Sequence, residues 1–306
     1  MASYHNEILR DNPLAYWKLD EENATTIVNF GSLGSSIYGA YSGNPTSVSG
    51  LVGDDNAMDF DGVDDGVLIS NYSNINAPYT SQRTIELTFN ADSVSGTQIL
   101  FEQGGLWFGG GLNISLEDNQ LNLGVWDNSS VEEVWLNYDN ISANTTYHVV
   151  LVFDNGNFTG YVNKESIGTV TTSFNSIHSN IGGAAIGQQN GDTRFSPGVI
   201  SGNSGYYFDG TIDDVALYNT ALSQERVEAH YSAISPIIGS NYNDYLEGDA
   251  GDNTIIGDGN GNVLSLDGTN DYVTTNNLTG LNTGNQEHTI EQWVYLPELP
   301  SGRAWL

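Results

Sequence analysis

The sequence predicts an all-β fold in which two sheets pack face to face as a sandwich. Apolar and polar residues alternate strictly over Thr84–Phe89, and the same alternation occupies Leu121–Trp126. Turn-forming pairs such as Asp118–Asn119 and Asn155–Gly156 separate these runs. Short alternating strands divided by such turns are typical of a sandwich.

The strand candidates follow one another along the first part of the chain. The first is Asn12–Asp20, which reads NPLAYWKLD, and the second is Ala57–Gly62, which reads AMDFDG. Between Thr146 and Asp154 lies a continuous apolar run, Val149–Phe153. We expect each of these segments to form one strand of the sandwich.

One helix is predicted near the end of this region. Ser223 is a favourable N-cap, and Glu225 falls in the first turn, where the helix dipole favours an acidic side chain. Val227 and Tyr231 are then expected to face the sheet. Pro236 follows shortly and is expected to mark the end of the domain, which gives a first domain over residues 1–234.

Five blocks of this region resemble laminin-G-like, concanavalin A-like jelly-roll domains and occur in the order of that family. They are Asn12–Asp20, Ala57–Gly62, Thr146–Asp154, Tyr161–Glu165 and Phe208–Asn219. In the fourth block Lys164 stands where the family usually has Gly. The resemblance implies a concanavalin A-like jelly-roll β-sandwich.

A second pattern lies within residues 235–265, where Gly239–Ser265 divides into three nine-residue units. Each unit begins with Gly, has Asp or Asn at its sixth position and Leu or Ile at its eighth. This period resembles the RTX repeats of secreted bacterial proteins, which form a parallel β-roll around Ca²⁺. The resemblance implies Asp244 and Asn262 as calcium ligands. A Gly/Asp/Asn-rich surface linker remains the alternative.

The chain then repeats itself over residues 266–306. Leu266–Val273 corresponds to Phe60–Val67, and His288–Val294 corresponds to Arg83–Phe89. We interpret this segment as an incomplete second laminin-G-like copy, because it stops before the closing block. The chain is therefore expected to be a fragment of a longer, multidomain protein.

The composition is strongly acidic. Lys and Arg total 7 against 38 Asp and Glu, which gives a formal net charge of −31, and Cys is absent. Such a surface repels nucleic acid and anionic membranes, so neither is an expected partner. No apolar run is long enough to insert into a membrane. The acidity suits a divalent cation, and Ca²⁺ is the expected cofactor.

The jelly-roll resemblance also implies a structural Ca²⁺ that ties the first and last strands together. It nominates Asp20 together with Asp213 or Asp214, and the acidic residues of the second block add Asp61. Clustered carboxylates at strand ends repel one another unless a cation or a hydrogen-bond donor relieves them. The alternative is that Asp61 and its acidic neighbours are turn formers that bind their own backbone.

Aromatic rings on a sheet can stack on sugars while amides and carboxylates fix the hydroxyl groups. Trp126 is the preferred candidate, because Leu121, Leu123 and Val125 occupy the opposite face of its strand. The full set of candidate ligand-binding residues is Trp126, Trp107, Trp135, Tyr138, Asn122, Asp127 and Asn137. The alternative for each Trp is a position in the core.

Catalysis is not expected from this chain. Jelly-roll glycosidases place two catalytic carboxylates on one strand as E-x-D-x-x-E, and this motif does not occur. The expected function is non-catalytic binding of an extracellular glycan or glycoprotein, in a bacterial adhesin or secreted surface protein. Two alternatives stay open: a structural spacer of a surface protein, and an accessory domain of a polysaccharide-degrading enzyme.

Overall fold

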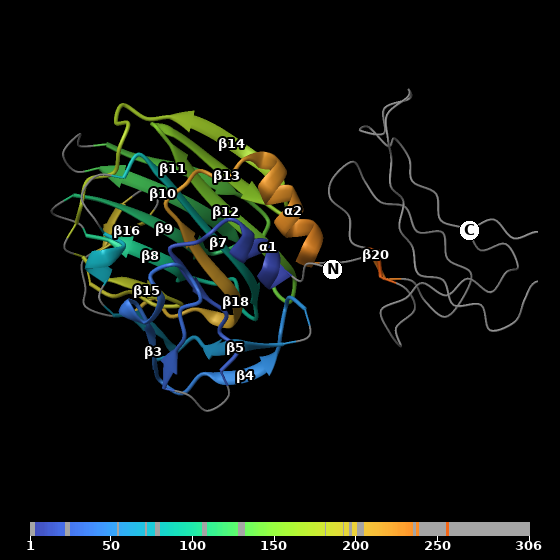
Figure 1. The fold of residues 1–306 in the computed structure, drawn as a ribbon. Coiled ribbons are helices and arrows are strands. Elements are labelled where there is room, and N and C mark those ends of the chain that lie inside the picture. Colours follow the sequence, from blue (N-terminus) through green and yellow to red (C-terminus); the bar gives the residue numbers. More distant parts are fainter. Residues whose placement is uncertain are drawn as a thin grey trace, which may run out of the picture.

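The computed structural model shows a sandwich of two antiparallel sheets, with two helices on the outer side of one of them (Figure 1). The fold class predicted from the sequence is confirmed. The structure describes residues 4–21, 25–53, 55–70, 72–76, 80–105, 109–127, 132–180, 182–191, 193–195, 198–200, 205–234, 237–238 and 255–256.

The helix-bearing sheet runs in the order β14-β13-β12-β7-β18-β5-β4, and β1 also pairs with β18. Its strands are β1 (Ala15–Trp17), β4 (Thr46–Ser49), β5 (Asn56–Asp61), β7 (Gln82–Ala91), β12 (Thr146–Asp154), β13 (Asn157–Val162), β14 (Glu165–Thr171) and β18 (Asp209–Tyr218). The opening strand β1 therefore lies against the closing strand β18, and the ends of the domain meet in one sheet.

The second sheet, which we call the front sheet, runs in the order β11-β10-β9-β8-β15-β6-β3-β2. Its strands are β2 (Thr26–Ile27), β3 (Gly39–Ser42), β6 (Gly66–Ile69), β8 (Thr97–Gly104), β9 (Gly110–Glu117), β10 (Gln120–Asp127), β11 (Glu132–Tyr138) and β15 (Ala184–Ile186). Two short helical turns, η1 (Gly34–Ser36) and η2 (Tyr72–Asn74), lie in connecting segments. β16 (Thr193–Phe195) and β17 (Gly198–Ile200) form a separate pair, and β16 contacts β8, β9 and β10.

The main core lies between the two sheets and follows the alternation read from the sequence. Ile85, Leu87 and Phe89 of β7 are fully buried there, and so are Leu121 and Leu123 of β10. Burying a large aliphatic or aromatic side chain stabilises the fold by about 1.5–3 kcal/mol relative to leaving it exposed. The intervening residues of each strand consequently lie on the two outer faces of the sandwich.

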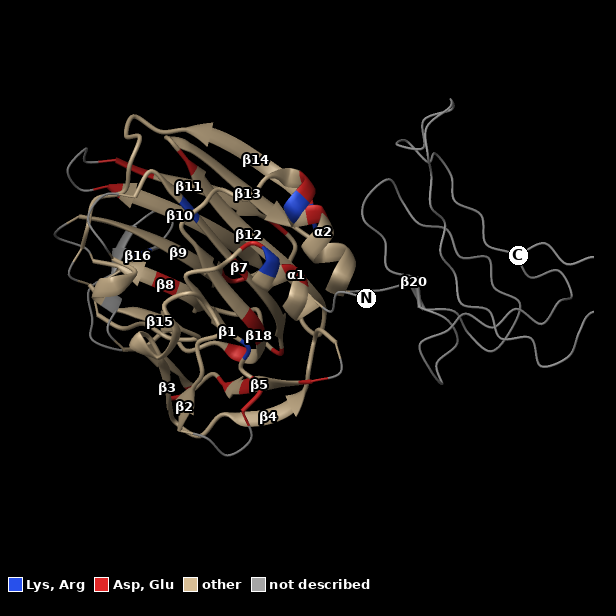
Figure 2. Cartoon of the chain, in the orientation of Figure 1, with Lys and Arg blue, Asp and Glu red and all other residues tan. Residues whose placement is uncertain are grey.

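Two helices cover the outer face of the helix-bearing sheet. The helix α2 (Gln224–Ile234) begins one residue after Ser223, as predicted, and Val227 is buried. The helix α1 (Tyr4–Arg10), which the sequence analysis did not predict, packs against α2. Basic residues are sparse, and Arg10 and Arg226 lie on these helices (Figure 2).

A buried polar cluster joins the helices to the sheet. The carboxylate of Glu86 accepts hydrogen bonds from Tyr4 Oη at 2.7 Å, His148 Nε2 at 3.0 Å and His230 Nδ1 at 2.9 Å. His230 Nε2 lies 2.8 Å from Asp11 Oδ2. Burial alone would lower the pKa of His230, but the charges of Glu86 and Asp11 raise it to about 9. We call these residues the Glu86 cluster; it is a structural anchor for α1 and α2.

After α2 the structure describes only two short strands, β19 (Ile237–Ile238) and β20 (Ile255–Ile256), which pair in parallel. The expected second copy, residues 266–306, lies outside the described residues. None of the described helices has the length and apolar character needed to cross a membrane.

Candidate functional site

The outer face of the front sheet brings together four of the seven predicted ligand-binding residues. Trp126 and Asn122 lie on β10, and Trp135 and Asn137 lie on the neighbouring strand β11. Asn122 is directly opposite Asn137, and the rings of Trp126 and Trp135 stack at a centroid distance of 6.5 Å and an interplanar angle of 22°. We call these four residues the aromatic platform.

Two glycines allow both indoles to lie flat on the sheet. A Cβ atom at Gly124 would come within 2.2 Å of the Trp135 ring, and one at Gly111 would come equally close, 2.2 Å, to the Trp126 ring. Any larger residue at either position would push a ring off the sheet. The platform is therefore built by the glycines of β9 and β10 as much as by the tryptophans.

The two tryptophans differ in their exposure. Trp126 is 0% exposed and its Nε1 donates to the Gly105 carbonyl oxygen at 3.1 Å. Trp135 is half-buried, and Asn137 beside it is exposed. Trp126, the residue preferred from the sequence, therefore has no face open to a ligand in this conformation, and it supports Trp135 from the side.

Several buried polar atoms next to the platform lack hydrogen-bond partners among the described residues. Asn122 is 1% exposed, and neither its amide oxygen nor its amide nitrogen is hydrogen-bonded. The others are Asn113 Oδ1, Ser115 Oγ and Trp135 Nε1. Ser115 is opposite Asn122, while Asn113 and Trp135 lie on either side of Gly124. Buried polar groups are normally satisfied, so this group calls for a partner from outside the chain or for water.

A segment of the chain crosses the same face. We call residues 187–191 and 193–195 the strap. Asn190 N donates to Glu102 Oε1 at 2.9 Å, and Arg194 Nη1 pairs with Glu133 Oε2 at 2.9 Å. Burial raises the pKa of the Glu102 carboxyl well above its usual range. The strap covers β8 and β9 and leaves Trp135 and Asn137 accessible.

The remaining predicted ligand-binding residues do not join the platform. Tyr138 is opposite Leu121 and packs against the core. Asp127 is 0% exposed, and its Oδ2 lies 2.8 Å from His178 Nδ1. Trp107 lies outside the described residues.

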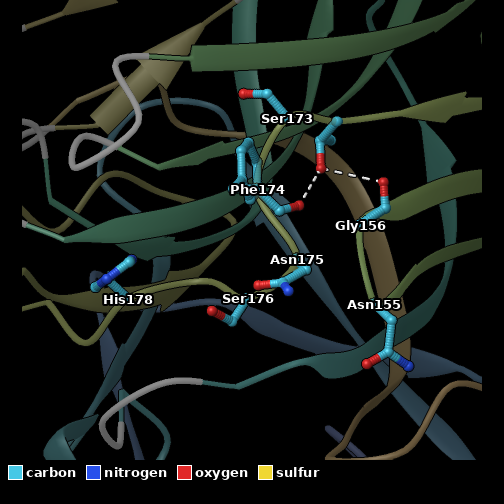
Figure 3. Close-up of a pocket in the computed structure, with 8 residues that line it drawn as sticks. Asn155, Gly156, Ser173, Phe174, Asn175, Ser176 and His178 are labelled. Atoms are coloured by element: carbon cyan, nitrogen blue, oxygen red, sulfur yellow. Dashed lines mark hydrogen bonds between the residues drawn. The ribbon is translucent and has the colours of Figure 1, made fainter.

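One end of the sandwich carries a hollow of about 300 Å³, which we call the edge hollow (Figure 3). Its lining comes from the β12–β13 turn and from the irregular segment that follows β14: Asn155, Gly156, Thr172, Ser173, Phe174, Asn175, Ser176 and His178. The sequence analysis missed this site, because no periodicity marks the segment. The only signals were the Asn155–Gly156 turn and a run of polar residues.

Two of the predicted metal ligands lie on the closing strand. A β-bulge follows Asp213, and Asp214 has a left-handed backbone with φ 52°, so both carboxyl groups are buried. Asp213 Oδ2 accepts the N–H groups of Leu51 and Val52 at 2.8 and 3.1 Å, while its Oδ1 has no partner in the described chain. Burial, and then the charge of Asp55, raise the pKa of Asp213 to about 8.

Asp20 is engaged differently. Lys18 Nζ lies 2.5 Å from Asp20 Oδ2 and 2.6 Å from Asp55 Oδ2, so one ammonium group already pairs with both carboxylates. Asp214 is bonded by the Tyr16 hydroxyl. The buried, unpartnered Asp213 Oδ1 fits a cation, whereas the Lys18-bound Asp20 does not fit a shared calcium shell.

Asp61 lies in the one group of three or more potential metal ligands that converge among the described residues. Its carboxylate and those of Asp64 and Asp65 lie within 4.8 Å of one another. Asp61 Oδ1 also accepts the Val63 N–H at 2.8 Å, and Asp65 Oδ1 accepts the Asn44 N–H at 2.6 Å. The turn-forming role weighed in the sequence is thus present, and a cation would relieve the remaining repulsion. Asp244 and Asn262 lie outside the described residues.

Comparisons with known structures agree with the fold. The chain resembles the structure of botulinum neurotoxin type C described with the statement that cell entry depends on interaction with two ganglioside molecules (TM-score 0.54, 13% identity, 78% of this chain and 54% of that chain). It also resembles the botulinum neurotoxin serotype G binding domain (TM-score 0.54, 9% identity, 72% and 50%). A third is the neurotoxin DC binding domain in complex with SialylT (TM-score 0.52, 11% identity, 76% and 54%).

These similarities concern the fold alone, and the chain spans about half the length of the neurotoxin domains it matches. No curated protein sequence matches the chain significantly. The family model for the concanavalin A-like lectin/glucanases superfamily, a laminin G domain model, matches residues 61–228, which is more than half of the chain. With two antiparallel sheets of the expected jelly-roll type, the chain belongs to the concanavalin A-like lectin/glucanases superfamily.

Proposed function

We propose that this protein is a non-catalytic carbohydrate-binding module and that the aromatic platform is its glycan contact. The observation that carries the proposal is the half-exposed Trp135, stacked on Trp126, beside the unpartnered amide of Asn122. Sugars present an apolar ring face together with hydroxyl groups that both donate and accept. An indole plane beside an Asn amide matches both features.

The unpartnered polar atoms strengthen this proposal. A buried donor or acceptor without a partner costs about 1–3 kcal/mol. Asn122 carries two such atoms, its amide oxygen and its amide nitrogen. A glycan hydroxyl reaching past the exposed Asn137 would satisfy the amide. The similar neurotoxin structures are binding domains, and one is described in connection with gangliosides, which agrees with a glycan ligand.

A glycan array with matched variants tests the proposal. The wild-type protein is expected to bind a defined set of glycans, and Trp135→Phe and Asn122→Leu are each expected to weaken binding at least tenfold. Glu165→Gln, at an exposed position on β14 of the other sheet, is the control and should bind normally. Absence of any glycan binding by the wild type would favour the spacer function instead.

We further propose that Ca²⁺ stabilises the protein. The converging carboxylates of Asp61, Asp64 and Asp65 support one site, and the unpartnered Asp213 Oδ1 supports another. The nine-residue period supports a third, because Ile237 and Ile255 pair in parallel at a separation of 18 residues (255 minus 237), twice that period. In a parallel roll of this period, every second unit lies in the same sheet.

Calcium binding is tested by thermal unfolding. At a Ca²⁺ concentration 100 times the Kd, binding to the native state adds about 2.7 kcal/mol of stability. The melting temperature should rise in Ca²⁺ and fall in EDTA. Asp61→Asn should reduce the rise, whereas Asp139→Asn, at an exposed residue of the β11–β12 connection, should not. Equal melting temperatures with and without Ca²⁺ would reject the proposal.

We also propose an extracellular location for the protein, as in a bacterial adhesin or secreted surface protein. The chain lacks Cys, and calcium at the millimolar concentrations outside cells would occupy weak carboxylate sites. Fractionation of the source cells with an antibody to this domain tests the location. Recovery of the protein from the cytosol alone would contradict it.

A further inference from the structure

The walls of the edge hollow are held by the backbone. The carbonyl oxygen of Gly156 accepts the Thr172 N–H at 2.7 Å and the Thr172 hydroxyl at 3.1 Å. At the other end of the segment, Ile177 exchanges two backbone hydrogen bonds with Thr80, at 2.8 and 3.0 Å. These bonds fix residues 172–178 without using the side chains of Asn175 and Ser176.

Side chains reinforce the same segment from two directions. Phe174 is buried and stacks on Phe153 at a centroid distance of 5.6 Å and an interplanar angle of 21°. Glu132 of β11 accepts the Ser173 N–H at 2.8 Å and is also bonded by the Ser173 hydroxyl. A ligand entering the hollow would therefore meet a preformed surface and would not have to order it, which lowers the entropic cost of binding.

The groups left for a ligand are amides and a hydroxyl. Figure 3 shows the side chains of Asn175 and Ser176 between His178 and Asn155. Neither Asn175 nor Ser176 has a side-chain hydrogen-bond partner in the described part of the chain. The ring of His178 is oriented by the buried Asp127, whose Oδ2 lies 2.8 Å from Nδ1. An amide and a hydroxyl both donate and accept, as a sugar hydroxyl requires.

We propose that the edge hollow is a second binding site, which takes a single neutral sugar residue independently of the aromatic platform. Its volume of about 300 Å³ lies at the lower end of the range for small-molecule sites, ~300–1,000 Å³. Glu132 and Asp154 border it, and the chain carries a formal charge of −31. A carboxylated or sulfated sugar would be repelled, so the ligand is neutral. The residues differ from those of the platform, so the site goes beyond the function proposed above.

An NMR titration tests this site separately. The probes are methyl β-galactopyranoside, methyl α-glucopyranoside and methyl α-mannopyranoside, with N-acetylneuraminic acid as the anionic comparison. At least one neutral probe should shift the side-chain amide signals of Asn155 and Asn175 and the ring signals of His178. The anionic sugar should leave these signals unchanged.

Variants assign the shifts to the hollow. Ser176→Phe fills it and should abolish the shifts, and Asn175→Ala, at an exposed position, should weaken binding at least tenfold while leaving the fold intact. Asn137→Ala on the platform is the matched control and should leave the hollow's response unchanged. The proposal is overturned if no neutral probe moves these signals, if only N-acetylneuraminic acid does, or if both hollow variants respond like the wild type. Loss of platform binding alone does not affect it.

Discussion

The two outer faces of the sandwich differ in whether their buried polar groups are hydrogen-bonded. On the helix-bearing sheet, the carboxylate of Glu86 is surrounded by donors from Tyr4, His148 and His230. On the front sheet, the amide of Asn122 is as deeply buried and has no partner in the described residues. Satisfied polar clusters hold a structure together, whereas unsatisfied ones retain a cost that a ligand can remove. The difference separates an anchor from a candidate binding surface.

The largest effect is expected at the anchor. Glu86→Ala leaves His230 charged and buried without its main counter-charge, and removing one partner of a buried pair costs about 3–5 kcal/mol. Urea unfolding measures this change, with Glu86→Gln as a control that keeps the side-chain volume and should cost less. An unchanged free energy of unfolding for Glu86→Ala would show that the cluster is not an anchor.

The stability of the protein should depend on pH through the titration of His230 and Glu86 in the Glu86 cluster. The pKa of His230 is raised to about 9 in the folded protein, against about 6.5 in the unfolded chain. Its contribution is therefore complete below pH ~6.5 and is lost as the pH rises towards about 9. Burial alone would raise the pKa of Glu86, but His230 and His148 lower it, so its contribution is lost in acid below about pH 4.5.

Melting temperatures recorded from acid to alkaline pH test both losses of stability, the one in acid (the acid limb) and the one in alkali (the alkaline limb). His230→Gln should flatten the alkaline limb, because the titrating group is gone. The pKa of the buried Asp213 carboxyl is raised to about 8, so its contribution to the stability of the protein is also lost as the pH rises towards about 8. Asp213→Asn is the variant that removes this contribution. An alkaline limb that persists unchanged in both variants would contradict this assignment.

The smallest effect on stability is expected at the front sheet. Asn122→Leu removes two unsatisfied buried atoms at similar volume, so the free energy of unfolding should stay the same or rise by about 1 kcal/mol. The same substitution is expected to weaken glycan binding. A clear loss of stability instead would mean that ordered water or another partner already satisfies the amide, and the contrast between the two faces would disappear.

Alternation in the sequence was sufficient to predict much of the front sheet. Because Leu121, Leu123 and Val125 face the core, Asn122 and Trp126 had to share the other face, and they do. The same parity would have placed Tyr138 on the core side, since it is opposite Leu121. The burial of Trp126 could not be predicted, because its ring lies over Gly111 of β9 and beside Trp135 of β11, and its Nε1 donates to the carbonyl oxygen of Gly105.

The environment of the acidic residues and the position of the edge hollow could not be predicted from the sequence. Clustered Asp residues predicted calcium ligands, but only tertiary structure shows that Lys18 lies between Asp20 and Asp55. The edge hollow joins the β12–β13 turn to residues 172–178, which have no regular period. Such sites arise from non-local pairing, for which one sequence carries no direct pattern.

The most direct test of the account is to map a bound glycan on the two faces by NMR. The best-binding glycan from the array should shift the indole N–H signal of Trp135 and the side-chain amide signals of Asn122 and Asn137. The ring signals of His148 and His230 in the Glu86 cluster should not move. Shifts confined to the Glu86 cluster, or a bound glycan that leaves the Trp135 indole signal in place, would contradict the account.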